Sequence, residues 1–409
     1  MIRRLAMVVL LCALSLPASA AVDRPSVEHQ FQAWLPADLW PEARAVGVTR
    51  VVFDRAFAGV TLDWTMPELH PPGAPTTLPP NTAQAEFRDP GAYFNKAGLT
   101  RLAKAGAQRL AQWKQTLAAI SAKYGVPAPI LVAIWAKESD FGAESLPKLA
   151  IPALATEAFI GLRKDYFRGE LIAALEILQR GGVMPDEMRA SWAGAMGQSQ
   201  IMPSEYLASA VDFDGDGRID IWHSVPDSLA TTARLIADKG WQADRGWGVE
   251  ARVPQSVACT LDGPDQGKPV GAWAKLGVTR ADGRPLPASS GRDYLVMPAG
   301  RFGPAFIVTD NFYTLKTYNN SDLYALYVGH LADRLADNRP FIGKWSAPTG
   351  FTRGEVKVMQ DALVAKGYDV GKPDGLVGYK TRIAIGLWQT KQGQPATCWP
   401  DKELVKSIR

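Results

Sequence analysis

The sequence contains few of the residues that form transition-metal or redox centres. Its 409 residues include three cysteines and four histidines, with no Cys-x-x-Cys pair and no histidine cluster. This scarcity excludes a zinc site with the usual ligand spacing. Beyond the first 20 residues only Cys259 and Cys398 remain. An oxidising compartment would allow them to form a disulfide, but the sequence leaves open whether they meet.

Strongly one-sided charge and long apolar runs are also missing. The formal net charge is +4, and lysine and arginine are scattered along the chain. The sequence therefore lacks the basic patch that nucleic-acid binding requires. No segment beyond residue 20 approaches the roughly 20 apolar residues that are needed to span a bilayer. We expect a soluble protein with no transmembrane segment and no nucleic-acid partner.

Residues 1–20 have the features of an export signal. Two arginines precede an apolar stretch over residues 5–16, and small residues near position 20 provide a cleavage site. We expect this segment to be removed and the mature protein to act outside the cytoplasm. Cys12 follows Leu11, where lipid attachment would need a small residue, so we do not expect a lipid anchor.

The spacing of apolar residues predicts a mainly α protein with more than one domain. Helical spacing is continuous over residues 99–124 and recurs as far as residue 239, and it returns at 311–337. Residues 247–304 contain short β-prone pieces separated by Gly and Pro, which predict a small sheet inserted among helices. We predict three consecutive segments: a core over residues 21–340, a linker over 341–350, and a small helical domain over 351–409.

Glu138 is the strongest candidate for a catalytic acid. It follows the apolar stretch 129–135 and precedes Phe141, in a segment that predicts the end of a helix. Apolar neighbours and the negative end of the helix macrodipole both raise the pKa of a carboxyl group. Glycosidases usually use two carboxylates, but Asp140 would point to a different side of the helix. A glutamate at a helix end is more often solvated or ion-paired than catalytic. The choice between these interpretations of Glu138 therefore depends on the residues around it.

Two further segments have the composition of a ligand-binding groove. Residues 193–204 combine small side chains with amides, which allows close approach of backbone to a ligand. The alternative is a tight junction between helices. Residues 318–321 and Tyr324 combine aromatic rings with amide groups, the mixture that sugar sites use. The alternative is that these tyrosines belong to the core or its rim.

Residues 212–223 match the pattern of a calcium-binding loop. Acidic residues occupy positions 1, 3, 5 and 9, position 7 offers a backbone carbonyl, and Gly217 stands at position 6. His223 occupies position 12, where a bidentate glutamate is normal, so Asp227 is the candidate replacement. The alternative is an exposed acidic turn. The candidate metal ligands are Asp212, Asp214, Asp216, Arg218 through its carbonyl, Asp220 and Asp227.

Taken together and in this order, the motifs resemble the membrane-bound lytic murein transglycosylase B family over residues 31–335. They comprise Glu138-Ser139, the Ala-Gly-Ala-Met-Gly stretch that begins at Ala193, the Asp-rich loop, and Tyr318-Asn319-Asn320-Ser321. Residues 351–409 resemble a small three-helix peptidoglycan-binding domain. The residues that carry this second resemblance include Gln360, Leu363, Asp374-Gly375, Thr381-Arg382 and Trp388-Gln389.

The resemblance implies a lysozyme-like helical core and cleavage of the β-1,4 bond between N-acetylmuramic acid and N-acetylglucosamine in peptidoglycan. Glu138 would act first as acid and then as base, giving 1,6-anhydromuramic acid ends without consuming water. This role would explain why no second carboxylate is evident. The implied substrate contacts are Ser139, Ser191, Gln200, Tyr318, Asn319 and Tyr324.

The resemblance also implies a structural Ca²⁺ ion and no organic cofactor. We expect a periplasmic monomer that binds glycan strands, and association with other cell-wall enzymes stays open. Two alternatives also stay open. One is a hydrolytic muramidase, in which water attacks instead of the muramyl 6-hydroxyl group. The other is a scaffold that binds peptidoglycan without cleaving it.

Overall fold

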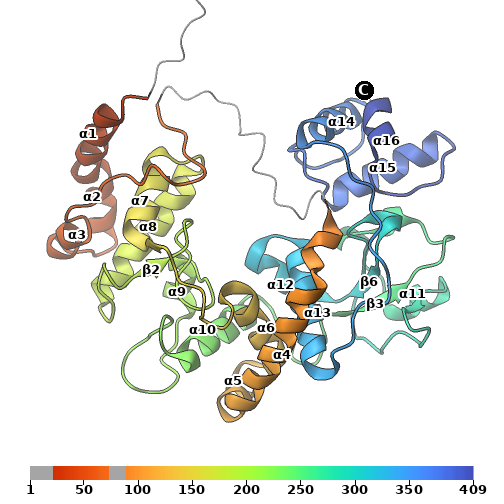
Figure 1. Cartoon of the computed structure of the whole chain (residues 1–409), viewed down its shortest axis with the longest axis horizontal. Coiled ribbons are helices and arrows are strands. Elements are labelled where there is room, and N and C mark those ends of the chain that lie inside the picture. Colours follow the sequence, from red (N-terminus) through yellow and green to blue (C-terminus); the bar gives the residue numbers. More distant parts are fainter. Residues whose placement is uncertain (1–21, 73–88, 409) are drawn as a thin grey trace, which may run out of the picture.

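The computed structural model describes residues 22–72 and 89–408 (Figure 1). The expected export signal, residues 1–20, lies outside the described residues. Within the described part, no single helix has the length and apolar character to cross a membrane. Helices α5 (Lys114–Tyr124) and α6 (Ala128–Ser139) reach the required length and apolar character only when the two are counted together, and the chain bends by 109° between them.

An N-terminal lobe is built from helices that pack around α8. Phe31, Phe53 and Phe167 lie in its core together with the apolar face of α7. The chain enters this lobe twice, because α1 to α3 precede the central helices and α7 and α8 follow them. Its helices are α1 (Arg24–Trp34), the π-helix η1 (Leu35–Leu39), α2 (Trp40–Ala45), α3 (Arg50–Ala56), α7 (Ala150–Ile160), α8 (Lys164–Arg180) and α9 (Pro203–Ser209).

A second group of helices surrounds α6, which is apolar on almost every side. Residues 130–136 of α6 are all buried, and α6 contacts four other helices, α4, α5, α10 and α13. Burial on all sides explains why its sequence reads as a continuous apolar run. The other elements of this group are η3 (Pro90–Phe94), α4 (Lys96–Gln112), α5, α10 (Val225–Asp238), α12 (Asp310–Asn319) and α13 (Asp322–Asp337).

The helical spacing over residues 99–124 does not form one helix. It divides at Trp113, whose backbone leaves helical geometry at φ −104° and ψ 21°. No glycine or proline marks the break. Both α4 and α5 contact α6, so tertiary packing separates two helices that the apolar spacing would join.

The small sheet expected between residues 247 and 304 is present, and it extends to residue 308. Four antiparallel strands lie in the order β4-β3-β6-β5. In β6, Phe306 and Val308 face the helices around α6, while Ala305 and Ile307 face a separate apolar cluster. The sheet is therefore covered on both faces. Its strands are β3 (Gly248–Arg252), β4 (Thr279–Arg280), β5 (Tyr294–Val296) and β6 (Ala305–Val308); a separate pair is β1 (Lys148–Leu149) with β2 (Arg189–Ala190).

The C-terminal domain is a three-helix unit with its own core. It consists of α14 (Arg353–Ala365), α15 (Tyr379–Lys391) and α16 (Lys402–Ser407). A capping box between Thr352 and Glu355 begins α14. Val356, Met359 and Ile385 lie in the core. The mainly α class with a small inserted sheet and a helical C-terminal domain is thus confirmed.

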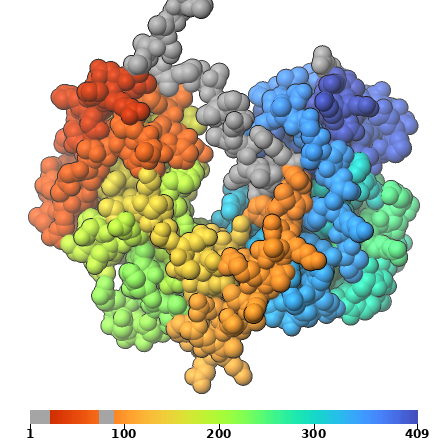
Figure 2. Space-filling model, in the orientation of Figure 1, coloured from red at the N-terminus to blue at the C-terminus, as the bar shows by residue number. Residues whose placement is uncertain are grey.

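This domain is joined to the sheet region by a disulfide between Cys259 and Cys398. Cys259 begins η4 (Cys259–Leu261), which contacts α15. The connecting segment 338–352 also packs on the core, because Trp345 stacks on Phe94 with ring centroids 5.1 Å apart. The N-terminal lobe and the C-terminal domain stand on opposite sides of a hollow, with α12 near its base (Figures 1 and 2).

Candidate active site

Glu138 lies in the last turn of α6, where the buried helix reaches the protein surface. Its side chain is partly buried. Burial raises the pKa of Glu138 to about 7, and the nearby charge of Glu144 adds to this effect. A hydrogen bond from Tyr324 and the charge of Lys137 act in the opposite direction. The carboxyl group is therefore poised to exist in both protonation states near neutral pH.

Two stacked tyrosines lie beside Glu138. Tyr324, the third residue of α13, is fully buried and donates a hydrogen bond from its hydroxyl group to Glu138 Oε1. Tyr318, in the last turn of α12, lies parallel to it, with ring centroids 6.0 Å apart and planes 7° apart. Burial and the charge of Glu138 raise the pKa of both phenols well above the ordinary value. Both tyrosines therefore remain hydrogen-bond donors.

The turn after α6 has an unusual backbone. Asp140, Phe141 and Gly142 have successive positive φ angles of 49°, 62° and 79°. A side chain at Gly142 would place its Cβ only 2.6 Å from Gln198 Oε1. Non-glycine residues rarely adopt this conformation, and such strain persists only where surrounding contacts hold it. The turn is thus fixed against the loop that contains Gln198.

Ser139 helps to fix this turn against the loop that contains Gln198. Its hydroxyl group donates to the carbonyl oxygen of Gln198 over 2.6 Å and accepts from the backbone N–H of Gly142 over 2.8 Å. The side chain is buried, with 2% of its surface exposed. Ser139 was expected to contact substrate, but in this structure its hydroxyl group is occupied by backbone partners. These two hydrogen bonds connect the turn after Glu138 to the loop that contains Gln198.

Gln198 is a site residue that sequence reasoning missed. Its Oε1 accepts a hydrogen bond from Trp135 Nε1 over 2.9 Å, and its Nε2 donates to the carbonyl oxygen of Trp222 over 3.1 Å. One amide side chain thus connects α6, the loop 193–204 and the segment before α10. The sequence places Gln198 in a run of small residues and amides, which indicates a binding segment. Only the fold shows which of these amide side chains contacts α6.

The hydrogen bonds of the described residues include none between Glu138 and the remaining expected groove residues. Ser191 and Gln200 are partly exposed in or beside the loop 193–204, and Gln200 Nε2 donates to the carbonyl oxygen of Gly197. Tyr318 reaches the same loop through a hydrogen bond to the carbonyl oxygen of Ser199. Asn319 is exposed at the end of α12. The contacts of the described residues bring only Tyr324 directly onto the Glu138 carboxylate.

Asp140, the nearest carboxylate to Glu138 in the sequence, is paired with Arg101. Its two oxygens accept hydrogen bonds from Arg101 Nη1 over 2.9 and 2.8 Å. The acidic neighbour that does affect Glu138 is Glu144, which acts through its charge.

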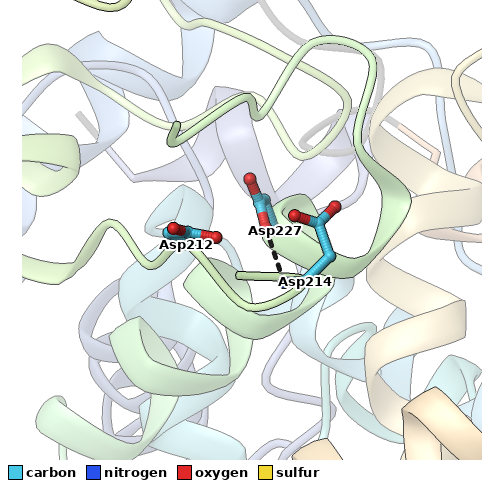
Figure 3. A group of neighbouring side chains, drawn as sticks. All are labelled: Asp212, Asp214 and Asp227. Atoms are coloured by element: carbon cyan, nitrogen blue, oxygen red, sulfur yellow. Dashed lines mark hydrogen bonds between the residues drawn. The ribbon is translucent and has the colours of Figure 1, made fainter. Parts of the chain in front are cut away.

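Two carboxylates of the acidic loop, Asp212 and Asp214, lie beside that of Asp227 in α10 (Figure 3). Ligand atoms of Asp212, Asp214 and Asp227 lie within 4.8 Å of one another. Asp227 is 1% exposed in the first turn of α10 and accepts hydrogen bonds from the backbone N–H groups of Phe213 and Asp220. The salt bridges among the described residues include none to these three carboxylates. Uncompensated acidic groups at this separation fit a hard divalent cation.

Two other expected ligands, Asp216 and Asp220, lie outside this group of three carboxylates. Asp216 is exposed and accepts from the N–H of Arg218. Asp220 accepts from the N–H groups of Trp222 and His223, and its Oδ2 lies 3.1 Å from His223 Nδ1. The loop is thus shaped largely by hydrogen bonds from its own backbone to its carboxylates.

A helical core with Glu138 at the end of its buried central helix, a small inserted sheet and a separate helical domain define a protein of the lysozyme-like class. Sequence comparison narrows this class. Residues 30–333 match the transglycosylase SLT domain, and residues 352–408 match a peptidoglycan-binding domain. The first match covers more than half of the chain. The protein therefore belongs to the transglycosylase SLT domain family, and the resemblance found in the sequence is confirmed.

Individual relatives agree with this assignment. The chain is 33% identical over 220 residues to the membrane-bound lytic murein transglycosylase B of Escherichia coli K12, an alignment that covers 52% of this chain and 58% of that protein. The chain thus aligns with little more than half the length of this curated relative.

Two solved structures show how far the similarity of fold extends. SltB3 from Pseudomonas aeruginosa, solved in complex with NAG-anhNAM-pentapeptide, has a TM-score of 0.80 and 38% identity. It covers 93% of this chain and 99% of its own. Slt35 from Escherichia coli, a lytic transglycosylase solved in complex with calcium, has a TM-score of 0.53 and 29% identity. It covers 61% of this chain and 80% of its own.

Proposed function

We propose that this protein is a lytic transglycosylase that cleaves the β-1,4 bond between N-acetylmuramic acid and N-acetylglucosamine in peptidoglycan. The observation that carries the proposal is the state of Glu138. Its pKa is raised to about 7, and Tyr324 donates a hydrogen bond to its carboxylate. A group with this pKa can donate a proton and later accept one at the same pH.

The reaction divides into two proton transfers at Glu138. In the first, protonated Glu138 gives its proton to the glycosidic oxygen as the bond to C1 of the muramyl residue breaks. In the second, the carboxylate takes a proton from the muramyl 6-hydroxyl group while that oxygen bonds to C1. The products are a free 4-hydroxyl group and a 1,6-anhydro end, so no water is consumed and Glu138 returns protonated.

Two features support a mechanism with one carboxylate. Asp140 is engaged by Arg101, so it does not serve as the second group that glycosidases ordinarily use. The substrate's own N-acetyl group would relieve positive charge at C1, as in other substrate-assisted glycosidases. Tyr324 would stabilise the carboxylate between the two transfers. The complexes of SltB3 with NAG-anhNAM-pentapeptide and with NAG-NAM-pentapeptide support the same choice of substrate.

For the remaining residues we propose roles that follow from their positions. Ser191, Gln200, Tyr318 and Asn319 would orient sugar and N-acetyl groups. Asp212, Asp214 and Asp227 would hold a structural Ca²⁺ ion, a choice supported by the calcium complex of Slt35. Ca²⁺ would neutralise these carboxylates and brace the segment before α10. The C-terminal domain would retain a monomeric enzyme on glycan strands in the periplasm.

Replacing Glu138 tests the proposal. Glu138→Gln keeps the shape of the side chain but can neither give nor take the proton, so we expect release of soluble muropeptides to cease. Retention on purified sacculi should be unchanged. Mass spectrometry of the wild-type products distinguishes the alternatives. Anhydro ends support transglycosylation, reducing ends that are one water heavier would show hydrolysis, and binding without release would show a scaffold.

A further inference from the structure

The C-terminal domain is attached to the core by a buried ion pair as well as by the disulfide. Arg382, from α15, is only 3% exposed. Its Nε donates to Asp262 Oδ2 over 2.6 Å, and its Nη2 donates to Asp322 Oδ2 over 3.2 Å. Both aspartates belong to the core: Asp262 follows η4, and Asp322 begins α13. One arginine of the C-terminal domain therefore joins two separate segments of the core.

Asp322 connects this ion pair to the candidate active site. It stands two residues before Tyr324 in the first turn of α13, next to Ser321, whose hydroxyl group accepts from the N–H of Tyr324. Tyr324 in turn donates to Glu138. The chain of contacts from Arg382 to the catalytic carboxyl group thus passes through a single helical turn.

Lys316 fixes the same turn from its other side. Its Nζ lies 2.8 Å from Asp322 Oδ1, which ties α12 to the start of α13. The Nζ atom also lies 5.7 Å from the centre of the Tyr379 ring in α15. Burial alone would raise the pKa of Asp322, but the charges of Lys316 and Arg382 lower it below the ordinary value. Two cations and the two aspartates balance, and loss of Arg382 would leave Asp262 buried and uncompensated.

Further contacts between the C-terminal domain and the core lie beside this ion pair. The disulfide lies three residues from Asp262, at Cys259. Near it, the N–H of Arg301 donates to the carbonyl oxygen of Thr397 over 2.9 Å. A cavity of about 90 Å³ lies at this junction and is lined by residues of both domains, including Asn320, Asp322 and Tyr379. The contacts of Arg382 therefore belong to an interface that several other contacts between the two domains also stabilise.

We propose that Arg382 is a positioning residue for catalysis: through Asp322 it holds the first turn of α13, and with it the Tyr324 hydroxyl group, against Glu138. This inference rests on the proposed function of Glu138. It makes the C-terminal domain part of the catalytic unit in addition to its role in retention on the wall. Displacements of about 1 Å in a catalytic group can reduce turnover up to about a hundredfold.

The test compares two substitutions on α15 in the full-length protein. Arg382→Gln removes the cation that contacts Asp322. Lys380→Gln removes a cation whose partner, Asp369, belongs to the same domain. We expect Arg382→Gln to lower kcat on soluble glycan strands by about tenfold or more, with KM and retention on sacculi unchanged. The alkaline limb of its pH profile should move upward, because Tyr324 no longer holds down the pKa of Glu138. Lys380→Gln should match the wild type.

A second variant keeps the test decisive if Arg382→Gln unfolds the domain. Asp322→Asn leaves the pair between Arg382 and Asp262 in place, and it should reproduce the loss of kcat. The double variant should lose no more than Asp322→Asn alone, because Arg382 acts on the turn only through Asp322. Unchanged kcat, a change in KM alone, or additive losses would overturn the positioning role. A wild-type protein that releases no anhydro-muropeptides would instead overturn the proposed function.

Discussion

The hydrogen bond from Tyr324 to Glu138 allows the tuning of the acid to be measured. The hydroxyl group donates to the carboxylate, so it stabilises the charged form and lowers the pKa of Glu138 against the larger, raising effect of burial. Tyr324→Phe removes the donor and keeps the ring stacked on Tyr318. We therefore expect the pKa of Glu138 to rise further above its value of about 7.

The size of the change follows from the energy of the bond. A hydrogen bond to a charged group contributes about 1.5–3 kcal/mol, and one pKa unit corresponds to about 1.36 kcal/mol. Loss of the bond should thus raise the pKa by about one to two units. The alkaline limb of kcat/KM reports ionisation of the acid in the free enzyme, so it should move from near pH 7 to about pH 8–9.

The assay is the release of anhydro-muropeptides from soluble glycan strands over a range of pH. Tyr318→Phe is the matched control, because its hydroxyl group bonds to the backbone of Ser199 and not to the carboxylate. That variant should keep the alkaline limb of the wild type. An unchanged or lowered limb in Tyr324→Phe would refute the tuning described here, even if the overall rate fell.

Three other perturbations have definite outcomes. Chelation of calcium should lower the Tm more than the turnover rate at room temperature, and Asp227→Asn should abolish this effect; a melting curve insensitive to chelator would exclude a filled site. Gly142→Ala should cost about 1–3 kcal/mol in the free energy of unfolding and slow turnover, since its φ is +79° and the Cβ would meet Gln198; equal stability to wild type by denaturant titration would contradict this. Replacing Cys259 and Cys398 by serine should lower the free energy of unfolding by up to about 4–5 kcal/mol, because the bond closes a loop with a sequence separation of 139; the same titration measures it.

Much of the fold could be predicted from the sequence because its signals are local. The apolar run before Glu138 predicts a buried helix that ends nearby, and α6 ends at Ser139. The break at Trp113 could not be predicted, because packing against α6 produces it without glycine or proline. The position of the C-terminal domain on the core could not be predicted either, because its disulfide and ion pair join residues far apart in the sequence.

The site divides in the same way. Burial of Glu138 follows from its neighbours in the chain, and Asp227 could be proposed as a metal ligand from a gap in a spaced motif. The contacts of Ser139 and Gln198 depend on which groups of other segments lie opposite them, and no local sequence pattern specifies those groups. Tyr324 was expected near substrate, whereas its direct bond to Glu138 required the arrangement of α6 and α13.

The disulfide between Cys259 and Cys398 determines what proteolytic cleavage can release from the protein. It spans the connecting segment 338–352, which has no helix or strand and contains exposed residues. A single cut in that segment would leave both halves covalently joined, and the ion pair of Arg382 would remain in place. Release of the C-terminal domain would require reduction of the disulfide as well as cleavage of the backbone.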